Sequence, residues 1–319
     1  AIKVRDYEVR LTKNKEERRQ VRALRYAVFC EEEGAFATEE QRNLREEYDG
    51  FDRFAEYMAV FHEGKVVGCY RIIDRAAAEK MGSFYTECEY NISKIKKVRG
   101  NIAEMSRACV DVRYRDNALV MRLLWAGLSE YVLRRKVRVL FGVASWVGQK
   151  PGLSAHAISY LYYNRLAPAR LRATVLTENF HESINPGLAR MNIMPREFVD
   201  EEEALRQMPP LIKGYLRIGA DFGKGVFVDK NFNTYDVFVT LQTKNISATY
   251  QKHFLGRENA LEDLDVDIDD GAVKTIGKIV LFPVTGPLKV LGSVVKFFLR
   301  EDAEDAEYVE DRDNENDAE

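Results

Sequence analysis

Charged residues interrupt four segments of the chain that are otherwise mostly apolar. The segments span residues 25–29, 48–52, 68–71 and 104–107. Their charged members include three arginines and three acids, namely Arg25, Arg71, Arg107, Asp49, Asp52 and Glu104. A charge in a core-facing strand or helix is strongly unfavourable unless an opposite charge pairs with it. We therefore expect the fold to bring these segments together, so that arginines and carboxylates neutralise one another in the interior.

Such a network has two interpretations. It can be a purely structural set of ion pairs that holds the core together. It can also be a functional site, since buried charges with perturbed pKa values are frequent at active sites. The spacing of the charges alone favours neither interpretation.

The periodicity of apolar residues predicts a mixed α/β order. Helices are expected at residues 14–32, with Asn14 as the N-cap, and at 117–135 and 154–164. Strands are expected at residues 7–11, 56–62, 65–73, 103–112, 137–146, 213–219, 225–229 and 235–243. Glu63-Gly64 is a hairpin signal between the second and third of these strands.

Charge is segregated along the sequence and divides it into four parts. Residues 1–257 form the expected folded body and carry a net charge of +9, whereas residues 258–270 hold seven acids and no base. We interpret the latter as an acidic linker. Residues 271–300 hold four lysines, one arginine and no acid, and residues 301–319 hold eleven acids and one arginine. The last part is predicted to be a disordered acidic tail.

The segment 271–300 combines basic and apolar residues in a helical pattern. Lys289, Ser293, Lys296 and Arg300 share one helical face, and the remaining positions are largely apolar. The prolines and lysines argue against a helix that crosses a bilayer. We expect an amphipathic helix lying on a membrane surface. A helix docked on the body itself, or one that binds a partner helix, is the alternative.

The four charged segments, in this order, resemble those of the acyl-homoserine-lactone synthases and their relatives. Residues 107–115, 123–128, 140–142 and 209–220 look like the bacterial ornithine N-acyltransferases, and the resemblance covers roughly residues 7–254. It implies an α/β GNAT acyltransferase fold, with a mixed, largely antiparallel central sheet flanked by helices, to which residues 271–300 add an amphipathic extension. It also implies transfer of a 3-hydroxyacyl chain from acyl carrier protein to the α-amine of ornithine, giving a lyso-ornithine-type aminolipid.

The resemblance also implies roles for the charged residues. Amide formation from a thioester needs a base that deprotonates the acceptor ammonium, and Glu104 takes that role. Backbone N–H groups just after Ser106 would stabilise the oxyanion. Arg71 and Arg107 would fix the network around Glu104 and bind the acceptor carboxylate. The remaining members of the acceptor side are Arg25, Phe29, Asp49 and Asp52. A tyrosine of the next helix, Tyr160, Tyr162 or Tyr163, would protonate the thiolate; a core or surface position is the alternative for each.

The acyl donor is expected to be acyl carrier protein rather than coenzyme A. The loop at residues 113–118 has no glycine, and so lacks the usual cradle for a pyrophosphate. A basic body suits an acidic carrier, and phosphopantetheine carries a single phosphodiester. The residues assigned to the donor side are Arg113, Arg115, Arg122, Ser145 and Trp146.

Other partners and functions are expected to be absent or are less favoured. We expect no bound cofactor, no metal site and no nucleic-acid partner, because the four histidines and four cysteines show no ligand spacing and no nucleic-acid motif is present. No signal peptide is visible, so a cytoplasmic protein, peripheral on the inner face of the membrane, is expected. The alternatives are a signal synthase, which usually has a tryptophan near Gly34–Phe36, and a non-catalytic membrane adaptor, which would not need buried charges.

Overall fold

The structure is a computed structural model that describes residues 1–116, 118–148, 150–176 and 190–243. The chain divides into two compact units, Ala1–Leu281 and Phe282–Glu319, and every described residue belongs to the first. The predicted boundary at residue 257, the acidic linker 258–270, the amphipathic segment 271–300 and the tail 301–319 lie outside the described residues. They therefore remain predictions.

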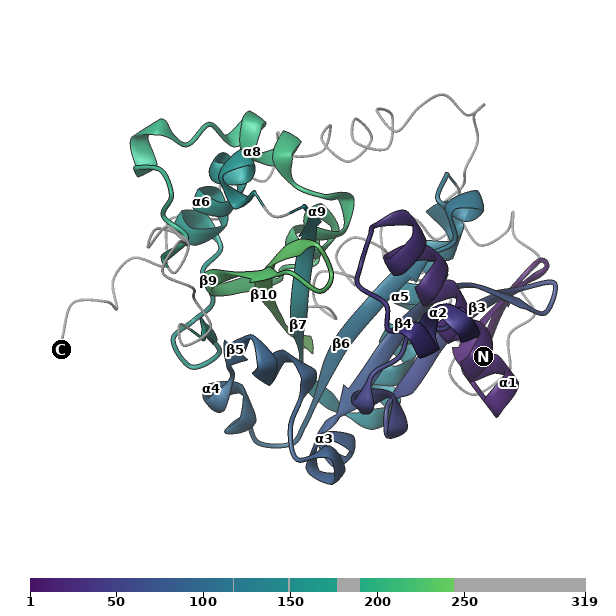
Figure 1. The fold of residues 1–319 in the computed structure, drawn as a ribbon. Coiled ribbons are helices and arrows are strands. Elements are labelled where there is room, and N and C mark those ends of the chain that lie inside the picture. Colours follow the sequence, from purple (N-terminus) through teal and green to yellow (C-terminus); the bar gives the residue numbers. More distant parts are fainter. Residues whose placement is uncertain (117, 149, 177–189, 244–319) are drawn as a thin grey trace, which may run out of the picture. The chain divides into compact units, whose positions relative to one another are not determined.

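A single large sheet organises the described residues (Figure 1). The strand order is β1-β2-β3-β4-β6-β7-β10-β9-β8-β5, and neighbours are antiparallel except for the parallel pairs β6–β7 and β8–β9. This confirms the predicted mixed, largely antiparallel sheet. The strands are β1 (Ile2–Val4), β2 (Tyr7–Leu11), β3 (Glu56–His62), β4 (Lys65–Asp74), β5 (Tyr90–Asn91), β6 (Asn101–Val110), β7 (Val137–Val147), β8 (Thr174–Val175), β9 (Asp221–Asp229) and β10 (Thr234–Gln242).

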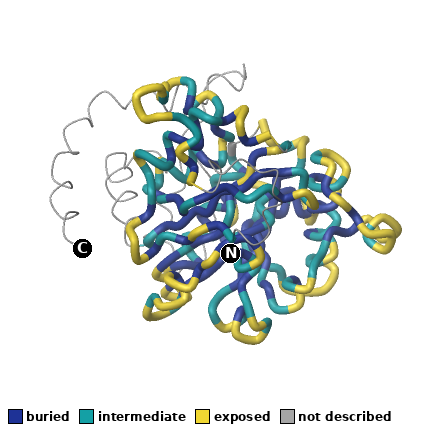
Figure 2. Tube along the Cα trace, turned by 60° about the vertical axis from the view of Figure 1, so that its left-hand side comes forward, coloured by how far each residue is buried: buried dark blue, intermediate teal, exposed yellow. Residues whose placement is uncertain are grey.

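Helices cover both faces of the sheet, and the buried strands run through the centre (Figure 2). The α-helices are α1 (Lys15–Arg25), α2 (Glu39–Leu44), α3 (Arg75–Met81), α4 (Ser93–Lys96), α5 (Ala118–Arg135), α6 (Ala155–Asn164), α8 (Glu201–Gln207) and α9 (Pro210–Arg217). One π-helix is present, η1 (Tyr26–Glu32), and the 3-10 helices among the described residues are η2 (Gly50–Arg53), η3 (Tyr85–Cys88), η4 (Val112–Tyr114), η5 (Pro151–Ser154) and η6 (Arg196–Phe198). No helix within the described ranges is both long and apolar enough to cross a bilayer.

The two faces follow from the alternation of side chains along the strands. On β3, Tyr57 and Ala59 pack with α1, whereas Met58 and Val60 pack with α5. We call these the α1 face and the α5 face. The elements η3, α3 and α4 also pack on the α1 face, around Ile73, while α6, α8 and α9 pack on the α5 face.

Two sequence predictions of secondary structure differ from the structure. The predicted strand at residues 213–219 is wrong, since α9 occupies it. Pro210 stands at the first helical position, where its missing N–H costs nothing, and Ile212 is buried on one side of the helix. The predicted helix 14–32 begins as expected, with Asn14 Oδ1 accepting from the Glu17 N–H at 2.9 Å, but it becomes π-helical at η1. Such π-helical turns are frequent near functional sites.

The strands β6 and β7 lie side by side at one end and then separate (Figure 1). Their pairing ends at Met105 and Gly142, after which β6 continues beside β4, and β7 beside β10. Gly142 makes the last approach feasible, because a Cβ there would lie 2.2 Å from the Met105 carbonyl oxygen. Glu104 therefore lies one residue before the point at which β6 and β7 stop pairing.

A bulge in β6 decides which charged side chains meet. Glu104 and Arg107 are three residues apart, so in a regular strand they would point to opposite faces. The register against β4 shifts between Cys69 and Arg71, and Arg107 adopts a left-handed φ of 53°. A non-glycine residue in this conformation is strained unless its surroundings hold it there. The bulge therefore places Glu104, Ser106 and Arg107 on the α1 face together.

Candidate active site

Glu104 lies beside the point where β6 and β7 separate and is fully buried. Its Oε2 accepts a hydrogen bond from the Thr86 backbone N–H at 3.3 Å, and its Oε1 is buried without a hydrogen-bond partner among the described residues. Burial raises the pKa of Glu104 to about 7, although the positive charge of Arg71 and the Thr86 N–H oppose the rise. A carboxylate with such a pKa is suited to accept a proton near neutral pH.

Arg25 is fully buried between two carboxylates of the predicted network. Its Nε donates to Glu47 Oε2 at 2.5 Å and its Nη1 to Asp52 Oδ1 at 2.8 Å. Burial would raise the pKa of Asp52, but the charges of Arg25 and Arg71 outweigh burial and lower it. Asp52 is therefore held in its ionised form.

Arg71 and Arg107 complete the network from β4 and β6. Arg71 donates from Nε to Ser106 Oγ at 3.0 Å, and from Nη1 to Asp49 Oδ1 at 2.6 Å and Asp52 Oδ1 at 3.2 Å. Arg107 pairs with Asp49 at 3.1 Å and with Glu47 at 3.4 Å. Three arginines thus face three carboxylates, which confirms that the charged segments meet in the interior. We call this set the balanced network: Arg25, Arg71, Arg107, Glu47, Asp49 and Asp52.

The balanced network differs in two ways from the prediction. Arg71 and Arg107 were expected to hold Glu104, but neither donates a hydrogen bond to it. Their donors go instead to Ser106 and to the other carboxylates. Backbone N–H groups of η3 hold Glu104 instead. Glu47 was missed, although it bridges Arg25 and Arg107. It sits in a run of charged residues after Arg45, which looks like an ordinary solvated surface, and only its pairing with distant arginines reveals its place.

Aromatic rings enclose the guanidinium of Arg107. The Arg107 Cζ lies 4.5 Å from the centre of the Tyr85 ring and 4.0 Å from that of Phe232. Phe29 packs edge-on against Phe232, with ring centres 5.9 Å apart. The predicted acceptor residue Phe29 therefore lies beside the network, while Tyr85 and Phe232 are additional neighbours that the sequence did not reveal.

The predicted donor-side residues are spread over both faces. Arg113 is exposed and pairs with Asp111 at 2.6 Å, and Arg115 pairs with Glu32 and donates to the Val110 carbonyl. Partial burial lowers the pKa of Arg122, on α5. Ser145 is exposed and lies opposite Asp236 in the sheet.

Trp146 and the three predicted tyrosines do not lie with Glu104. The Trp146 indole is buried on the α5 face, stacks on Tyr235 and donates to the Gln207 carbonyl at 2.9 Å. The tyrosines belong to α6, which packs on the same face. These four residues, Trp146, Tyr160, Tyr162 and Tyr163, therefore lie on the α5 face, whereas Glu104 lies on the α1 face.

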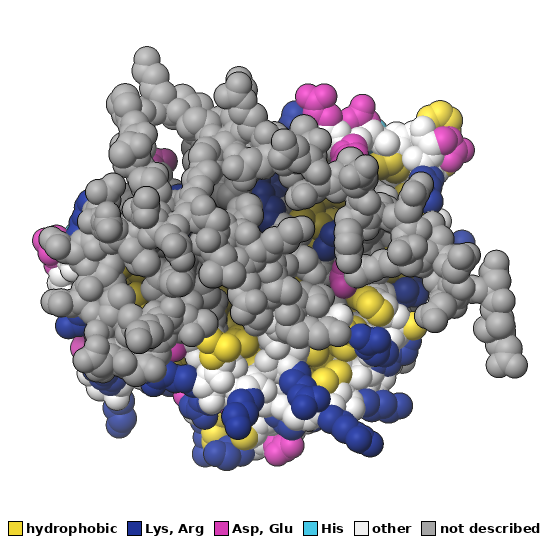
Figure 3. All heavy atoms as spheres, turned by 180° about the vertical axis from the view of Figure 1, so that it is seen from behind, with side chains coloured by type: hydrophobic (Ala, Val, Ile, Leu, Met, Phe, Trp, Pro, Cys, Tyr) yellow, Lys and Arg dark blue, Asp and Glu magenta, His cyan; other side chains and the backbone are white. Residues whose placement is uncertain are grey.

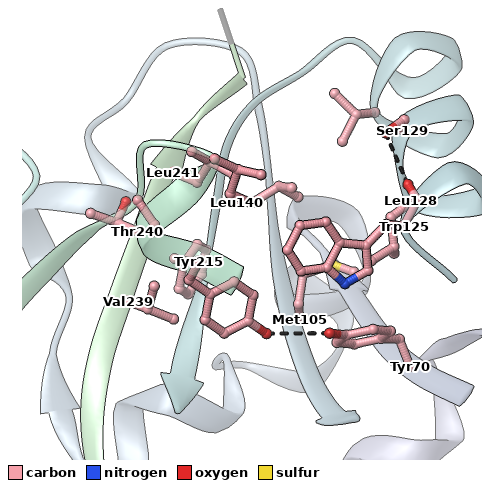
Figure 4. Close-up of a pocket in the computed structure, with 14 residues that line it drawn as sticks. Tyr70, Met105, Trp125, Leu128, Ser129, Leu140, Tyr215, Val239, Thr240 and Leu241 are labelled. Atoms are coloured by element: carbon pink, nitrogen blue, oxygen red, sulfur yellow. Dashed lines mark hydrogen bonds between the residues drawn. The ribbon is translucent and has the colours of Figure 1, made fainter. Parts of the chain in front are cut away.

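An apolar cavity of about 70 Å³ lies on the α5 face, directly beneath the separation of β6 and β7 (Figure 4). Met105, the neighbour of Glu104, contributes to its wall, and Tyr70 and Tyr215 meet across it with their hydroxyls 3.4 Å apart. Most of the remaining lining is apolar and comes from α5, β7, β10 and the residues that follow α9, including Trp125, Leu128, Leu140, Val239 and Leu241. Glu104 on one face and an apolar cavity on the other are thus joined by adjacent residues of one strand.

Three buried carboxylates could hold a cation near this site. Oxygens of Glu89, Asp229 and Asp236 lie within 4.8 Å of one another. They were not predicted from the sequence, because each is an isolated acid in a different segment. The described residues contain no other such group of His, Cys, Asp and Glu side chains.

Comparisons with known proteins agree with this chemistry. Residues 24–126 match the model of the acetyltransferase (GNAT) domain. The L-ornithine N(alpha)-acyltransferase of Rhodobacter capsulatus is 33% identical over 258 residues, which is 79% of this chain and 95% of that protein. The L-ornithine N(alpha)-acyltransferase of Agrobacterium fabrum is also 33% identical over 258 residues, covering 78% and 85% respectively.

Among solved structures, FeeM, an N-acyl amino acid synthase from uncultured soil microbes, aligns with a TM-score of 0.43 and 10% identity. It covers 78% of this chain and 96% of that chain. The ornithine acyltransferases are more similar in sequence to this chain, which aligns with almost the whole length of the Rhodobacter protein. The chain is an acyltransferase with a GNAT fold and belongs to the L-ornithine Nα-acyltransferase family.

Proposed function

We propose that this enzyme transfers a (3-hydroxy)acyl chain from acyl carrier protein to the α-amine of ornithine, giving a lyso-ornithine-type aminolipid. The observation that carries the proposal is a pair of buried polar atoms, on adjacent strands, that lack hydrogen-bond partners. Glu104 Oε1 and Arg71 Nη2 are both buried and have no hydrogen-bond partner among the described residues. An α-amino acid offers an ammonium to one and a carboxylate to the other, and a guanidinium suits a carboxylate. The names of the relatives support ornithine as that amino acid.

The reaction follows from the position of Glu104. Glu104 takes one proton from the acceptor ammonium, and the free amine attacks the thioester carbonyl where β6 and β7 separate. Backbone N–H groups following Ser106, where β6 no longer pairs with β7, stabilise the oxyanion. The tetrahedral intermediate then collapses. The new C–N bond remains, the C–S bond breaks, the nitrogen loses its second proton to solvent, and the thiolate leaves and is protonated from solvent.

The donor side is proposed from charge and from the apolar cavity. The first methylenes of the acyl chain enter the cavity behind Met105, since transfer of apolar groups out of water is favourable. The exposed Arg113 meets the acidic carrier or its phosphodiester together with Arg115 and Arg122. Lys and Arg side chains also gather along the lower part of the surface in Figure 3, which adds to the basic character of the body.

A membrane location is part of the same proposal. An acylated amino acid partitions into a bilayer at about 0.8 kcal/mol per buried CH₂. We propose that residues 271–300 hold the enzyme at the inner surface of the cytoplasmic membrane, where such a product is released. Co-sedimentation with anionic vesicles tests this location. Unchanged co-sedimentation after truncation at Asp270 would exclude a role for that segment.

Product analysis tests the main proposal. The purified full-length protein is incubated with ornithine and 3-hydroxyacyl-acyl carrier protein, or with the corresponding acyl-CoA, and the products are identified by mass spectrometry. We expect N-acylornithine from the carrier thioester, and at least about a 100-fold lower rate for Glu104→Gln. Glu79→Gln, which changes an exposed carboxylate, is the matched control and retains activity. Product formation only with S-adenosylmethionine would instead identify a signal synthase, and full activity of a folded Glu104→Gln protein would exclude the base.

A further inference from the structure

The carboxylates of Glu89, Asp229 and Asp236 form a second charged group, which we call the acidic triad. The three side chains are 2%, 7% and 3% exposed, and their oxygens lie within 4.8 Å of one another. Glu89 follows η3, Asp229 ends β9, and Asp236 lies in β10 opposite Phe227. Three distant parts of the sequence therefore converge on one point inside the protein.

The acidic triad is not neutralised as the balanced network is. Arg107 is the cation that acts on Glu89 and Asp236, but its hydrogen bonds go to Glu47 and Asp49. Burial, followed by repulsion from the other two carboxylates, raises the pKa of Glu89 well above its usual value. Burial also raises the pKa of Asp236 to about 7, although the Ser145 hydroxyl opposes this. The group is therefore electrostatically unfavourable when all three carboxylates are ionised.

Two oxygens of the acidic triad have no partner. Asp229 Oδ1 accepts from the backbone N–H groups of Asn231 and Phe232 at 2.8 and 3.0 Å. By contrast, Glu89 Oε2 and Asp236 Oδ1 are buried and accept no hydrogen bond in the described part of the chain. Buried polar atoms are normally satisfied, and each exception needs an explanation. A cationic donor that enters the cluster would satisfy both.

The spacing suits an ammonium group. An ammonium has three N–H donors in a tetrahedral arrangement, so three acceptors at about 2.8 Å from nitrogen lie about 4.6 Å apart. The oxygens of the acidic triad are at most 4.8 Å apart, which is compatible with that spacing. One ammonium can therefore donate one hydrogen bond to each carboxylate.

The turn η3 links the acidic triad to the reaction centre. The Thr86 N–H near its beginning holds Glu104, and Glu89 follows its last residue. Three residues of such a turn rise about 6 Å. The two nitrogens of ornithine are five bonds apart, about 6 Å when the chain is extended. The backbone span from Thr86 to Glu89 is therefore similar to the span between the two nitrogens of ornithine.

We propose that Glu89, Asp229 and Asp236 bind the distal ammonium of the acceptor and so select a diamino acid over one with a neutral side chain. This inference rests on the proposed function, because it places the α-amine at Glu104. Selection follows because a neutral side chain would leave the buried carboxylates without a cation, and unpaired polar groups discriminate strongly. Arg107 pairs with Glu47 and Asp49 and also acts electrostatically on Glu89 and Asp236.

Competition between ornithine and norvaline tests the acidic triad, because norvaline has the same carbon chain without the distal amine. For the full-length enzyme we expect kcat/KM for ornithine to exceed that for norvaline by about 100-fold or more. Asp236→Asn and Glu89→Gln should reduce kcat/KM for ornithine by a similar factor and leave that for norvaline nearly unchanged. Glu79→Gln, on the surface of α3, should change neither. Equal loss for both substrates would show a structural role and overturn the proposal.

A binding measurement on the unmodified enzyme keeps the test independent of the folding of the variants. Ornithine should raise Tm more than norvaline does at the same concentration, because ligands stabilise the state that they bind. Equal shifts would count against the subsite. Acylation of norvaline and ornithine with equal efficiency, still dependent on Glu104, would refute the subsite and leave the N-acyltransferase proposal intact. Absence of any acylated amino acid would refute the proposed function itself.

A divalent metal is the other cation that three carboxylates bind. The ornithine preference should be the same in EDTA and after addition of Mg²⁺ or Ca²⁺. Loss of the preference in EDTA, with recovery on adding either ion, would identify a metal site and overturn the ammonium proposal. Both ions are tested at the same ionic strength, so that screening does not alter the comparison.

Discussion

The balanced network and the acidic triad are both buried groups of charges on the α1 face, yet their chemistry differs. In the first, Arg25, Arg71 and Arg107 face three carboxylates at hydrogen-bond distance. In the second, three carboxylates face one another, and two of their oxygens have no partner. The balanced network also has two unpartnered donors, Arg25 Nη2 and Arg71 Nη2, but each of its charges faces an opposite charge. Paired buried charges stabilise the fold, whereas buried like charges without a counter-ion are suited to receive a cation. The difference can be tested by neutralising one charge in each group.

Removal of Arg25 should have the largest effect. Arg25→Ala removes a buried positive charge that pairs with both Glu47 and Asp52. The free energy of unfolding should therefore fall by about 4 kcal/mol. Chemical denaturation followed by circular dichroism measures this loss. Arg19→Ala removes an exposed arginine that pairs with Glu16 and should cost less than about 1 kcal/mol. Similar small effects for both variants would show that the balanced network does not stabilise the fold.

The pH dependence of Glu104 should give the next largest effect. Its pKa is raised in the folded protein to about 7, so the protonated form is favoured by folding. The stability that this contributes is full below the unfolded pKa, near 4.5, and is lost as pH rises through about 7. The loss is about 3 kcal/mol. Activity should rise over the same interval as the base ionises. Measurement of unfolding free energy and kcat/KM from pH 5 to 8 tests both, and Glu104→Gln should abolish this component of each dependence.

Loss of the Ser106 hydroxyl should have an intermediate effect. Ser106→Ala removes the acceptor of the Arg71 Nε–H and leaves that buried donor unpaired, which costs about 2 kcal/mol. Because Arg71 also faces the proposed acceptor carboxylate, KM for the amino acid should rise while the pH at half-maximal activity stays the same. A shift of that pH without a change in KM would instead place Ser106 in direct control of Glu104.

Neutralisation of one carboxylate of the acidic triad should have the smallest effect on the unfolding free energy, and should raise it instead of lowering it. Asp236→Asn relieves repulsion between buried carboxylates and should raise the unfolding free energy of the ligand-free enzyme by about 1 kcal/mol at pH 8. The pKa of Asp236 is raised to about 7, so this gain should disappear below about pH 4, where the aspartate is protonated in both states. Destabilisation at pH 8 would show that the triad resembles the balanced network after all.

Much of the fold and part of the site follow from local patterns in the sequence. The β3–β4 hairpin was predictable from the Glu63-Gly64 turn signal, and α5 and β7 were predictable from long runs rich in apolar residues. The convergence of Arg25, Asp52 and Arg71 was predictable because unpaired charges are not tolerated in core segments. The segment at residues 213–219 was misjudged because its apolar residues fit period two as well as the helical period, and tertiary packing of Ile212 decided between them.

The remainder of the site depends on contacts between distant residues. Glu89 and Asp236 are isolated acids whose meeting depends on the order of the strands, which no local pattern contains. Ser145 and Trp146 were both predicted at the site, although adjacent residues of a strand point to opposite faces. Only the assembled sheet shows that Ser145 points to the face of Glu104 and Trp146 to the other face. The bulge at Arg107 was likewise invisible, yet it reverses the direction of every later side chain in β6.

The short turn η3 runs from the backbone N–H that holds Glu104 to the residue that precedes Glu89. On the proposal above, the length of this turn sets the distance between the positions of the two acceptor nitrogens. A diamino acid one methylene shorter or longer than ornithine would misplace one of its two nitrogens by about 1.3 Å, more than a hydrogen bond tolerates. The enzyme would then measure its substrate as well as sense its charge, and both 2,4-diaminobutyrate and lysine would be poor acceptors for the same geometric reason.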